Sequence, residues 1–577
     1  MPEIPVDTLE TDVAIVGSGG AGLMCLLHLA RHTPQLDVVV VSKGAVGRSG
    51  CTRMVQGGFN AVLDPGDSLE LHFQDTLKAG GYVNDQELAW ALVHDAPSII
   101  SELEWECGCV FDRTSDNRLH QKPFAGQSFD RTIHRGDLTG IEIMSRLRDQ
   151  ALRLGPRELE DVRALDLIFD NDGELAGLTV LDVASGRFAV VLAKVVVIAT
   201  GGSATMYRIA APAREKTGDG IAMCLRAGLE VRDMEMLQFH PTGLLAGEST
   251  LTGAVLEEGL RGAGAYLRNG LGERFMERYD PERLERSTRD VVARSSYLEI
   301  VGGRGTPAGG VLLDISHLGA EEVERRFSGM VKRTRLIGCD LAREPIEVSP
   351  TAHFQMGGVI IDRDCRTSVE GLLVAGEDAG GTHGANRLGG NGVAESTVFG
   401  ARAGDTAIEV AAARRHRTPD SQQVQESLAR AVAPLRRDGP GVAPDTLTRE
   451  LKEVMWVGCG LVRSREGLET AGAAIRNMLD RTDAIATPGG LEWNVGWQQA
   501  LDLVNQLQVA HAMVASALVR EESRGAHFRD DFPERRDDEW LRFVVARLDG
   551  DVDIETDTRE VSFTRSRPPE ALAERAS

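Results

Sequence analysis

The sequence predicts an α/β protein with a Rossmann-like domain that binds a dinucleotide. Three widely separated segments share one order of residues, a short apolar run followed at once by glycines. Apolar runs of this kind are typical of parallel strands buried on both faces, so we expect one parallel sheet whose strand ends face a common crevice. The segments are Asp12–Val16 before Gly17–Gly22, Val195–Thr200 before Gly201 and Gly202, and Gly371–Ala375 before Gly376–Asp378.

The first of these segments carries the clearest dinucleotide motif. Gly17–Gly22 has the GxGxxG spacing, follows a strand directly and precedes an apolar helix that extends to about Leu29. Glycines here allow a tight turn and let a pyrophosphate reach the helix N-terminus, where unpaired N–H groups favour an anion. The motif alone is weak, but in this strand–turn–helix context it predicts a dinucleotide site.

The second strand, Asp37–Val41, lacks the acid that usually binds the ribose of NAD. It ends in Ser42 and Lys43 instead. This difference argues against a standard NAD site and leaves the ribose contact to another segment. Glu377, in the third glycine junction, and Asp219 are the candidates for a contact with the ribose or the adenosine half.

The composition predicts a soluble globular protein of several domains. The length of 577 residues predicts three or four domains of about 150 residues each. A net charge of −23 argues against nucleic acid, and against an anionic membrane as a direct partner. No stretch approaches the ~20 apolar residues of a membrane span. The acidic segment Met1–Glu10 lacks the order of a secretory signal.

The cysteines indicate a reducing compartment. There are eight in the chain, with no CxxC pair. Cys107 and Cys109 form the one close pair, which is weak evidence for a metal site. The spacing suits no iron–sulfur cluster, so we predict no metal in this chain and expect any such cluster on another polypeptide.

Four other segments combine histidine or arginine with small residues. In the last of them, Arg387 lies in a glycine-rich loop that allows close approach of a planar cofactor and leaves a guanidinium free for a carboxylate. In so acidic a protein, this local positive charge predicts a site for a small dianion. The segments are Gln238–Gly243, Thr288–Asp290, Thr351–His353 and His383–Asn391.

With these motifs the chain resembles the flavoprotein subunits of the succinate dehydrogenase/fumarate reductase family, which includes L-aspartate oxidase. The similarity extends from about Thr11 to about Pro533. The matching motifs, in order, are QGG (Gln56–Gly58), ATGG (Ala199–Gly202), GDG (Gly218–Gly220), QFHPTG, EGLRGAG (Glu258–Gly264), RDVVAR, AHFQMGG, HGANRLGGN and ESRGAH (Glu522–His527).

The resemblance implies FAD as the cofactor and a specific division of the chain. Residues 1–241 and 355–413 would form a discontinuous FAD-binding domain, and residues 242–354 an inserted α+β capping domain. Residues 414–530 would form a C-terminal helical domain, in which Leu447–Val462 and Trp497–Glu521 have helical periodicity. The C-terminal region, residues 531–577, is highly charged and shows little periodicity.

The family motifs also imply which residues contact FAD. They lie in the three glycine junctions, in the segment before QGG and at the end of HGANRLGGN. The predicted contacts are Gly17, Gly19, Gly20, Ala21, Gly22, Ser42, Lys43, Ser49, Cys51, Gln56, Gly57, Gly58, Ala199, Thr200, Gly201, Asp219, Glu377, Asn391, Gly392 and Val393.

By the same resemblance, Arg289 is the proton donor to fumarate, or the acceptor from succinate, opposite the flavin. A free arginine is a poor acid because its pKa lies above 12. The family supplies a proton relay behind it, for which this chain has Glu258 and Arg261. Substrate carboxylates would be bound by His240, His353 and Arg387, together with the residue at position 257.

Three positions depart from the family pattern. Cys51 stands where respiratory members have a histidine bonded covalently to the flavin, so FAD is either bound noncovalently, which we favour, or held through a Cys51 thioether. Glu257 replaces a threonine that binds a substrate carboxylate, and an anion there is unfavourable unless it is protonated or paired. Gly392 replaces a serine near the flavin.

The leading hypothesis is a succinate dehydrogenase or fumarate reductase catalytic subunit. It would exchange electrons with an iron–sulfur subunit and with a quinone. A membrane anchor subunit would hold the complex at the inner face of the cell membrane, on the cytoplasmic side. RLGGN at Arg387–Asn391 and the charged tail favour this over L-aspartate oxidase. Glu257 motivates a reductase of another unsaturated carboxylate as the alternative, and the retained histidines and arginines disfavour a non-catalytic scaffold.

Overall fold

The computed structural model describes residues 5–436, 441–550 and 552–569. Its main body is a seven-stranded sheet in the order β6-β2-β1-β9-β8-β7, with β16 pairing with β9. The three strands that precede glycines (β1, β9 and β16) lie in this sheet and run parallel to one another, as predicted. The sheet as a whole is mixed rather than parallel, because β7, β8 and β9 follow one another through short connections and pair antiparallel. The bounds are β1 Val6–Val16, β2 Val38–Val41, β6 Arg157–Leu159, β7 Val162–Phe169, β8 Leu175–Asp182, β9 Phe188–Ile198 and β16 Leu372–Val374.

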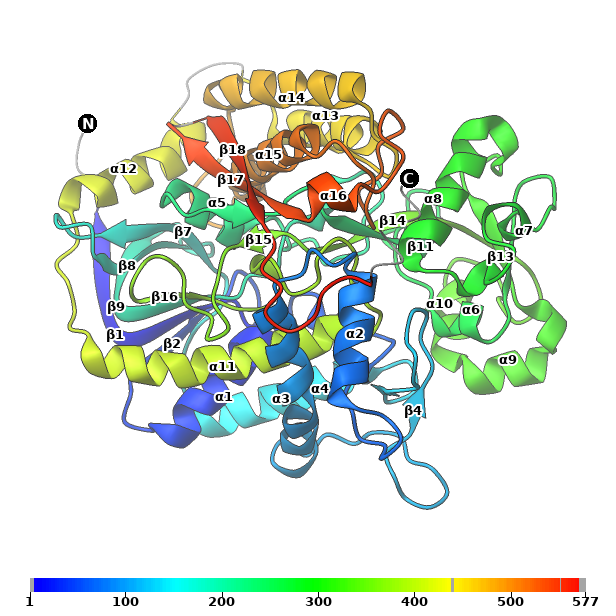
Figure 1. Ribbon diagram of the computed structural model, residues 1–577. Helices are drawn as coiled ribbons and strands as arrows, with labels where there is room; N and C mark the ends of the chain where they lie inside the picture. The colour runs from blue at the N-terminus through cyan, green and yellow to red at the C-terminus, as the bar shows by residue number, and fades with distance from the viewer. Residues whose placement is uncertain (1–4, 437–440, 551, 570–577) are drawn as a thin grey trace.

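Helices cover one face of this sheet. α1 (Gly20–His32) and α11 (Asn391–Ala413) lie side by side beneath it, with α4 (Thr139–Leu154) beside α1 (Figure 1). α1 buries nearly every residue of its first three turns, because its apolar side chains fill the space between the sheet and α11. Both α1 and α11 begin at the carboxyl edge of the sheet, so two helix N-termini open toward the same crevice.

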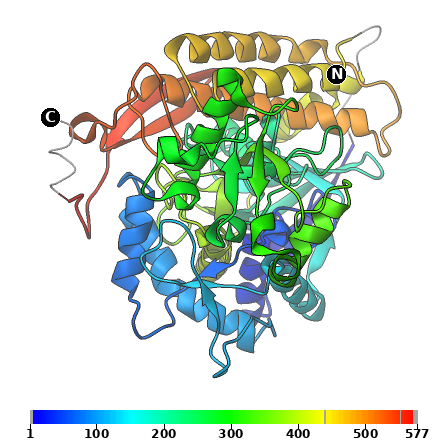
Figure 2. The same cartoon turned by 90° about the vertical axis from the view of Figure 1, so that its right-hand side faces the viewer.

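The inserted segment forms a second body with its own core, seen at the right of Figure 1 and facing the viewer in Figure 2. Its four-stranded antiparallel sheet has the order β11-β14-β13-β12. The predicted boundaries at 241/242 and 354/355 fall inside β11 and β14, so two paired strands connect the cap to the main body. The bounds are β11 Leu237–Leu244, β12 Tyr266–Arg268, β13 Val311–Asp314, β14 Ile346–Gln355, α6 Gly259–Gly262, α7 Met276–Tyr279, α8 Arg289–Glu299, α9 Ala320–Arg326 and α10 Ser328–Arg335.

The segment after α11 is helical, as its periodicity predicts. α13 and α15 correspond to the two periodic runs, and α13, α14 and α15 pack against one another at the top of the molecule in Figure 1. Apolar side chains of α12 contact the outer strands of the main sheet. The bounds are α12 Ser421–Val432, α13 Pro444–Gly458, α14 Arg465–Asp480, α15 Val495–Val519 and α16 Asp537–Trp540.

The charged C-terminal region contains ordered strands that the sequence analysis did not predict. β17 (Arg542–Asp549) and β18 (Asp553–Glu560) form a hairpin that extends a sheet of order β15-β10-β17-β18, with β10 at Val231–Arg232 and β15 at Gly358–Val359. The hairpin packs on α15. β18 is largely exposed and rich in charged side chains. It therefore lacks the alternation of apolar and polar residues that identifies a half-buried strand in a sequence.

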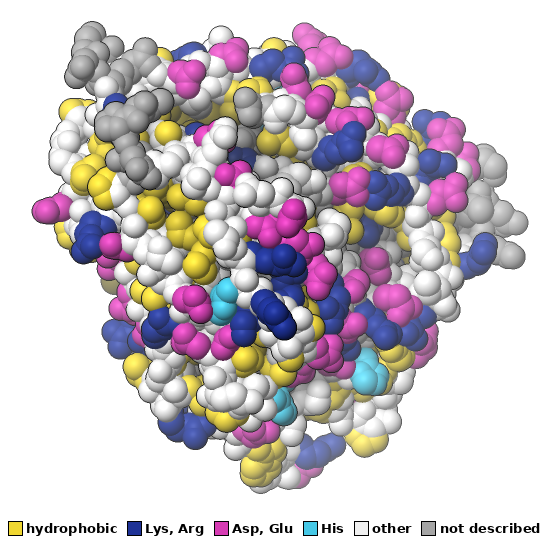
Figure 3. All heavy atoms as spheres, turned by 90° about the vertical axis from the view of Figure 1, so that its left-hand side faces the viewer, with side chains coloured by type: hydrophobic (Ala, Val, Ile, Leu, Met, Phe, Trp, Pro, Cys, Tyr) yellow, Lys and Arg dark blue, Asp and Glu magenta, His cyan; other side chains and the backbone are white. Residues whose placement is uncertain are grey.

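The surface carries both signs of charge. The face in Figure 3 shows Lys and Arg side chains interspersed with Asp and Glu, without a continuous basic stripe for a phosphate backbone. Within the described residues, no helix is both long enough and apolar enough to span a membrane.

Candidate active site

The predicted site residues meet at one cavity of about 660 Å³ between the carboxyl edge of the main sheet and the cap. Every predicted FAD contact except Gly22 and Asn391 lines it. So do His240, Glu257, Glu258, Arg289, His353 and Arg387, whereas Arg261 lies behind the wall. Its lining includes Val162 and Asp219 of the main body as well as Arg289 of the cap.

The glycine turn after β1 lets backbone segments approach so closely that a side chain at Gly17 or Gly22 would collide with a carbonyl oxygen. Gly17 has a φ of +109°, and a Cβ there would lie 2.1 Å from the carbonyl oxygen of Ala199 at the end of β9. A Cβ at Gly22 would lie 2.0 Å from the carbonyl oxygen of Gly17. Gly22 therefore brings α1 close to the turn, and Gly20, at the start of α1, opens into the cavity.

Both acids proposed for the ribose or the adenosine half line the cavity, and each is paired with a lysine. Asp219, at the start of α5 (Asp219–Arg226), lies 2.8 Å from Lys43 Nζ. Burial opposes its ionisation, but Lys43 and Arg163 lower the pKa of Asp219 below its usual value. Glu377 pairs with Lys216. Burial raises the pKa of Glu377 to about 7, although Lys216 acts to lower it.

The part of the cavity next to QGG combines small residues with one polar group that has no partner. Gln56 Nε2 donates to the carbonyl of Val255 in the cap at 3.0 Å, while its buried Oε1 accepts no hydrogen bond from the described residues. Thr52 Oγ1 accepts from the N–H of Gly20 at 3.1 Å. The glycine cradle, the helix N-terminus and the free Gln56 acceptor fit FAD. Burial raises the pKa of the nearby Cys51 thiol.

On the cap side of the cavity, the Arg289 guanidinium is held by the carboxylate of Glu258. It occupies the first turn of α8, and its Nε donates to Glu258 Oε2 at 2.8 Å. Arg261 is fully buried and places its Nη2 3.5 Å from Glu258 Oε1. Burial opposes ionisation of Glu258, but Arg289 and Arg261 lower the pKa of its carboxyl. The three side chains form one continuous line of charge from the cavity into the cap.

Gln238 links the two arginines, and the sequence analysis did not single it out as a site residue. Its Oε1 accepts from Arg289 Nη1 at 3.0 Å and from Arg387 Nη2 at 3.1 Å. Gln238 and His240 lie two residues apart on β11, so their side chains point to the same face of the strand. Because alternate residues of a strand share a face, the position two residues before His240 could have been predicted from the sequence to lie near the site.

His240 and His353 lie across the paired strands β11 and β14, with ring centroids 5.4 Å apart. Burial, together with Arg289 and His353, lowers the pKa of His240 well below its usual value. Burial and Arg387 have the same effect on the pKa of His353. Both imidazoles are therefore neutral, and each has one N–H that can donate to a carboxylate.

Arg387, in the HGANRLGGN loop, lies against an aromatic ring and close to the glycine that follows the motif. The guanidinium lies over the ring of Phe354, 4.3 Å from its centroid, and burial lowers the pKa of Arg387 to about 9. A Cβ at Gly392 would lie 2.7 Å from Arg387 Nη1, which gives a steric reason for glycine where the family has serine. Asn391 does not line the cavity, because its side chain bonds to Asn60 and to His72.

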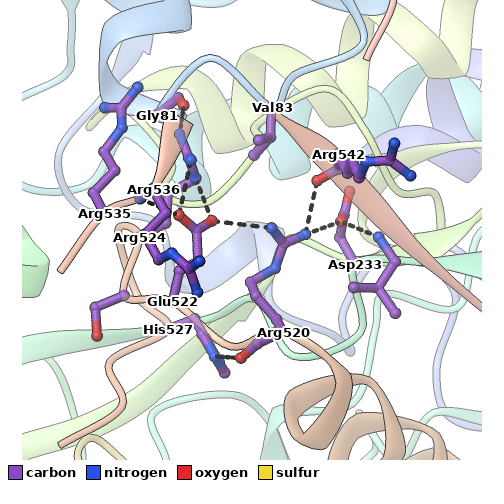
Figure 4. A network of polar contacts seen from close by, with 12 residues as sticks. Gly81, Val83, Asp233, Arg520, Glu522, Arg524, His527, Arg535, Arg536 and Arg542 are labelled. Carbon is purple, nitrogen blue, oxygen red and sulfur yellow. Dashed lines mark hydrogen bonds and ion pairs between the residues drawn. The ribbon is translucent and has the colours of Figure 1, made fainter. Parts of the chain in front are cut away.

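The loop that carries Arg387 is supported from behind by the C-terminal segment. Ala385 N donates to Gly80 O, and Ala526 N donates to Ala385 O at 2.9 Å. Arg524 Nη1 donates to Gly81 O at 2.7 Å. Figure 4 shows the buried network around this segment, in which Arg520 and Arg524 both contact Glu522. The ESRGAH motif thus holds the loop in place without reaching the cavity.

Comparison with known proteins agrees with this geometry. A family model described as an FAD binding domain matches residues 12–393, and one described as the fumarate reductase flavoprotein C-term matches residues 448–573. The chain is 34% identical to a succinate dehydrogenase flavoprotein subunit of Rickettsia bellii, over 96% of this chain and 95% of that protein. This chain belongs to the succinate dehydrogenase/fumarate reductase flavoprotein family. It is an FAD-dependent oxidoreductase of that type.

Two further relatives show the range of the family. A chain of quinol fumarate reductase from Escherichia coli superposes with a TM-score of 0.93 at 32% identity, over 98% of this chain and 99% of that one. A subunit of the fumarate reductase (CoM/CoB) of Methanothermobacter marburgensis is 42% identical over 93% of this chain and 97% of its own length. The fold of an FAD domain, a cap and a C-terminal helical domain is confirmed by the match to the quinol fumarate reductase chain.

Proposed function

We propose that this chain is the catalytic subunit of an enzyme that interconverts succinate and fumarate, with Arg289 as the proton donor or acceptor. The supporting observation is the contact of Arg289 with both Glu258 and Gln238 at the end of the FAD cavity. Proton transfer at one carbon of the double bond needs a group fixed opposite the hydride carrier, and a guanidinium clamped by two partners meets that need.

The residues around Arg289 divide the remaining tasks. FAD, when bound, supplies the acceptor or donor of the hydride. Neutral His240 and His353 donate N–H groups to the substrate carboxylates, and Arg387 provides the fixed positive charge. Ionised Glu258 lies between Arg289 and Arg261, so a proton can pass from one guanidinium to the next through its carboxylate. These cations also polarise the double bond as charge develops on it.

We further propose that electrons pass to or from an iron–sulfur subunit. If that subunit is bound to a membrane anchor, it would bring this chain to the inner face of the cell membrane. The named relatives differ in their redox partner, since one is a quinol enzyme and the other carries the CoM/CoB designation. A quinol and the pair of coenzyme M and coenzyme B are therefore both candidate electron donors.

The complex purified from its source should reduce fumarate with a reduced dye and oxidise succinate with an artificial acceptor, because the Arg289 site acts on both. Quinol should then be compared with coenzyme M plus coenzyme B as the donor for fumarate, and an iron–sulfur protein should copurify. Turnover of L-aspartate with oxygen, and none with succinate or fumarate, would overturn the assignment.

A reductase of another unsaturated carboxylate is the second candidate, favoured by Glu257 in the cavity wall. A carboxylate can accept a hydrogen bond from a substituent that fumarate lacks. The test is a panel of substituted unsaturated dicarboxylates compared by kcat/KM. Fumarate should have the highest value if the first proposal is right.

FAD should be released when the protein is denatured with acid, with no yellow fluorescence remaining on the chain. Burial raises the pKa of the Cys51 thiol, and a thiol that stays protonated is a weak nucleophile toward the flavin. The measurement is flavin fluorescence in a denaturing gel. A fluorescent band would contradict noncovalent binding, and its loss in Cys51→Ser would identify a thioether.

A further inference from the structure

Glu257 is an unusual residue for the wall of a dicarboxylate site. Its side chain is 4% exposed, it lines the cavity next to Glu258, and it lies in the cap just before α6. Burying an unpaired carboxylate is costly, and placing it beside a dianionic substrate adds repulsion. The structure therefore has to compensate for this charge if the cavity binds a dianion.

Lys122 provides that compensation from the opposite domain. It belongs to β4 (Gln121–Lys122), which lies on the main body in a small sheet of order β3-β5-β4, with β3 at Phe59–Asn60 and β5 at Thr132–Ile133. Its Nζ binds Glu257 Oε1. The lysine side chain is 16% exposed and extends over the ring of Phe124, which also lines the cavity. The pair thus joins the cap to the main body directly at the cavity wall.

The other charged groups near Glu257 would not neutralise it. Asp137 and Glu258 are both acidic, and they add to the burial that raises the pKa of Glu257. Arg333 of α10 lines the cavity, but its Nη1 donates to the carbonyl of Val255, and the charge it faces is Asp137. Among the groups that act on the Glu257 carboxylate in the described chain, Lys122 is the cation in contact with it.

The charges at this end of the cavity match a dianion only when Lys122 is counted. Arg261, Arg289 and Arg387 against Glu258 leave two positive charges in excess, and the two histidines are neutral. An ionised Glu257 alone would reduce that excess to one. Lys122 restores it to two.

We propose that the Lys122–Glu257 pair is a charge-compensated part of the dicarboxylate site, in which Lys122 allows a dianion to bind beside Glu257. This inference rests on the proposed function, because it takes the ligand to be a dicarboxylate. Lys122 acts through Glu257 and is a positioning residue. The pair fills the place where the family uses a neutral hydroxyl.

The test compares Lys122→Met, Glu257→Gln and the double variant, each as the FAD-loaded enzyme. The probe is malonate, an unreactive dicarboxylate, titrated by its effect on flavin absorbance. In Lys122→Met the Kd relative to wild type should rise about tenfold or more near about pH 8, and this rise should become clearly smaller toward about pH 6, because burial raises the pKa of Glu257 and its protonation removes the repulsion.

The double variant should bind malonate within about threefold of wild type at both pH values, since it has neither charge. Glu257→Gln alone should bind as tightly as wild type or more tightly. Lys194→Met is the matched control, because Lys194 pairs with Asp12 at 2.6 Å and does not line the cavity. Its Kd should be that of wild type.

A weakening in Lys122→Met that is equal at both pH values and persists in the double variant would overturn the inference, since it would indicate a structural role. KM and kcat for fumarate separate this result from a failure of the proposed function. If malonate follows the expected pattern but fumarate is not reduced, the charge compensation stands and the assigned substrate is wrong.

Discussion

Arg289→Lys should lower kcat for fumarate reduction by about a thousandfold while KM changes little. A positioned general acid typically contributes ~10²–10⁴-fold, and the effect falls on the transition state. Lysine cannot keep contacts with both Glu258 and Gln238, which Arg289 makes through separate nitrogens. The measurement is steady-state kinetics with a reduced dye, together with the flavin content, which should stay at the wild-type level.

Arg387→Lys is the matched comparison, because Arg387 shares the Gln238 acceptor with Arg289 but is assigned to binding. It should raise KM clearly, since the planar guanidinium grip on a carboxylate is lost. If Arg289→Lys retained most of its kcat, or lost kcat only as much as Arg387→Lys, Arg289 would not be the proton-transferring group.

Arg520→Met should destabilise the protein by about 3 to 5 kcal/mol, the usual cost of removing one partner of a buried ionic network. Arg520 is fully buried, with its Nη2 3.2 Å from Asp233 and its Nη1 3.2 Å from Glu522, and it also binds Glu235 (Figure 4 shows the contacts with Asp233 and Glu522). Without it, buried carboxylates lose their cation. The melting temperature of the FAD-loaded enzyme measures the effect.

The loss of stability in Arg520→Met should become smaller as the pH falls. Burial already raises the pKa of Glu235 although Arg520 opposes it, and removing the arginine raises that pKa further in the folded state. A carboxyl whose folded pKa exceeds its unfolded pKa destabilises at high pH, and the loss disappears on protonation. Arg547→Met, which breaks an exposed pair with Glu555, should leave the melting temperature unchanged. Equal effects of the two variants would contradict the role of the network.

The sequence allowed the central part of the fold to be predicted, because its signals are local. A strand followed by glycines specifies its own turn, whatever the rest of the chain does, and the strands before the three junctions run parallel in one sheet. The antiparallel strands β7 and β8 of that sheet carry no such signal and were not predicted. The periodic runs in α13 and α15 identified helices for the same reason. Motifs around His240, Arg289, His353 and Arg387 identified the residues that meet at the cavity.

The sequence could not show which distant groups neutralise one another. Lys122 is separated from Glu257 by more than a hundred residues, and the two meet because a small sheet on the main body lies against the cap. The C-terminal hairpin is similar. β17 pairs with β10 and the hairpin packs on α15, so contacts with distant segments define β18 more than its own charged sequence does.

The residue types by themselves therefore determined that this protein has a dinucleotide turn, a cluster of histidines and arginines, and helices after α11. The tertiary structure decided the charge state of the site. Neutral His240, ionised Glu258 and the Lys122–Glu257 pair all follow from burial and from partners on other elements. The physical reason is that the energy of a charge depends on its desolvation and on its neighbours in space, and both are set only when distant segments pack together.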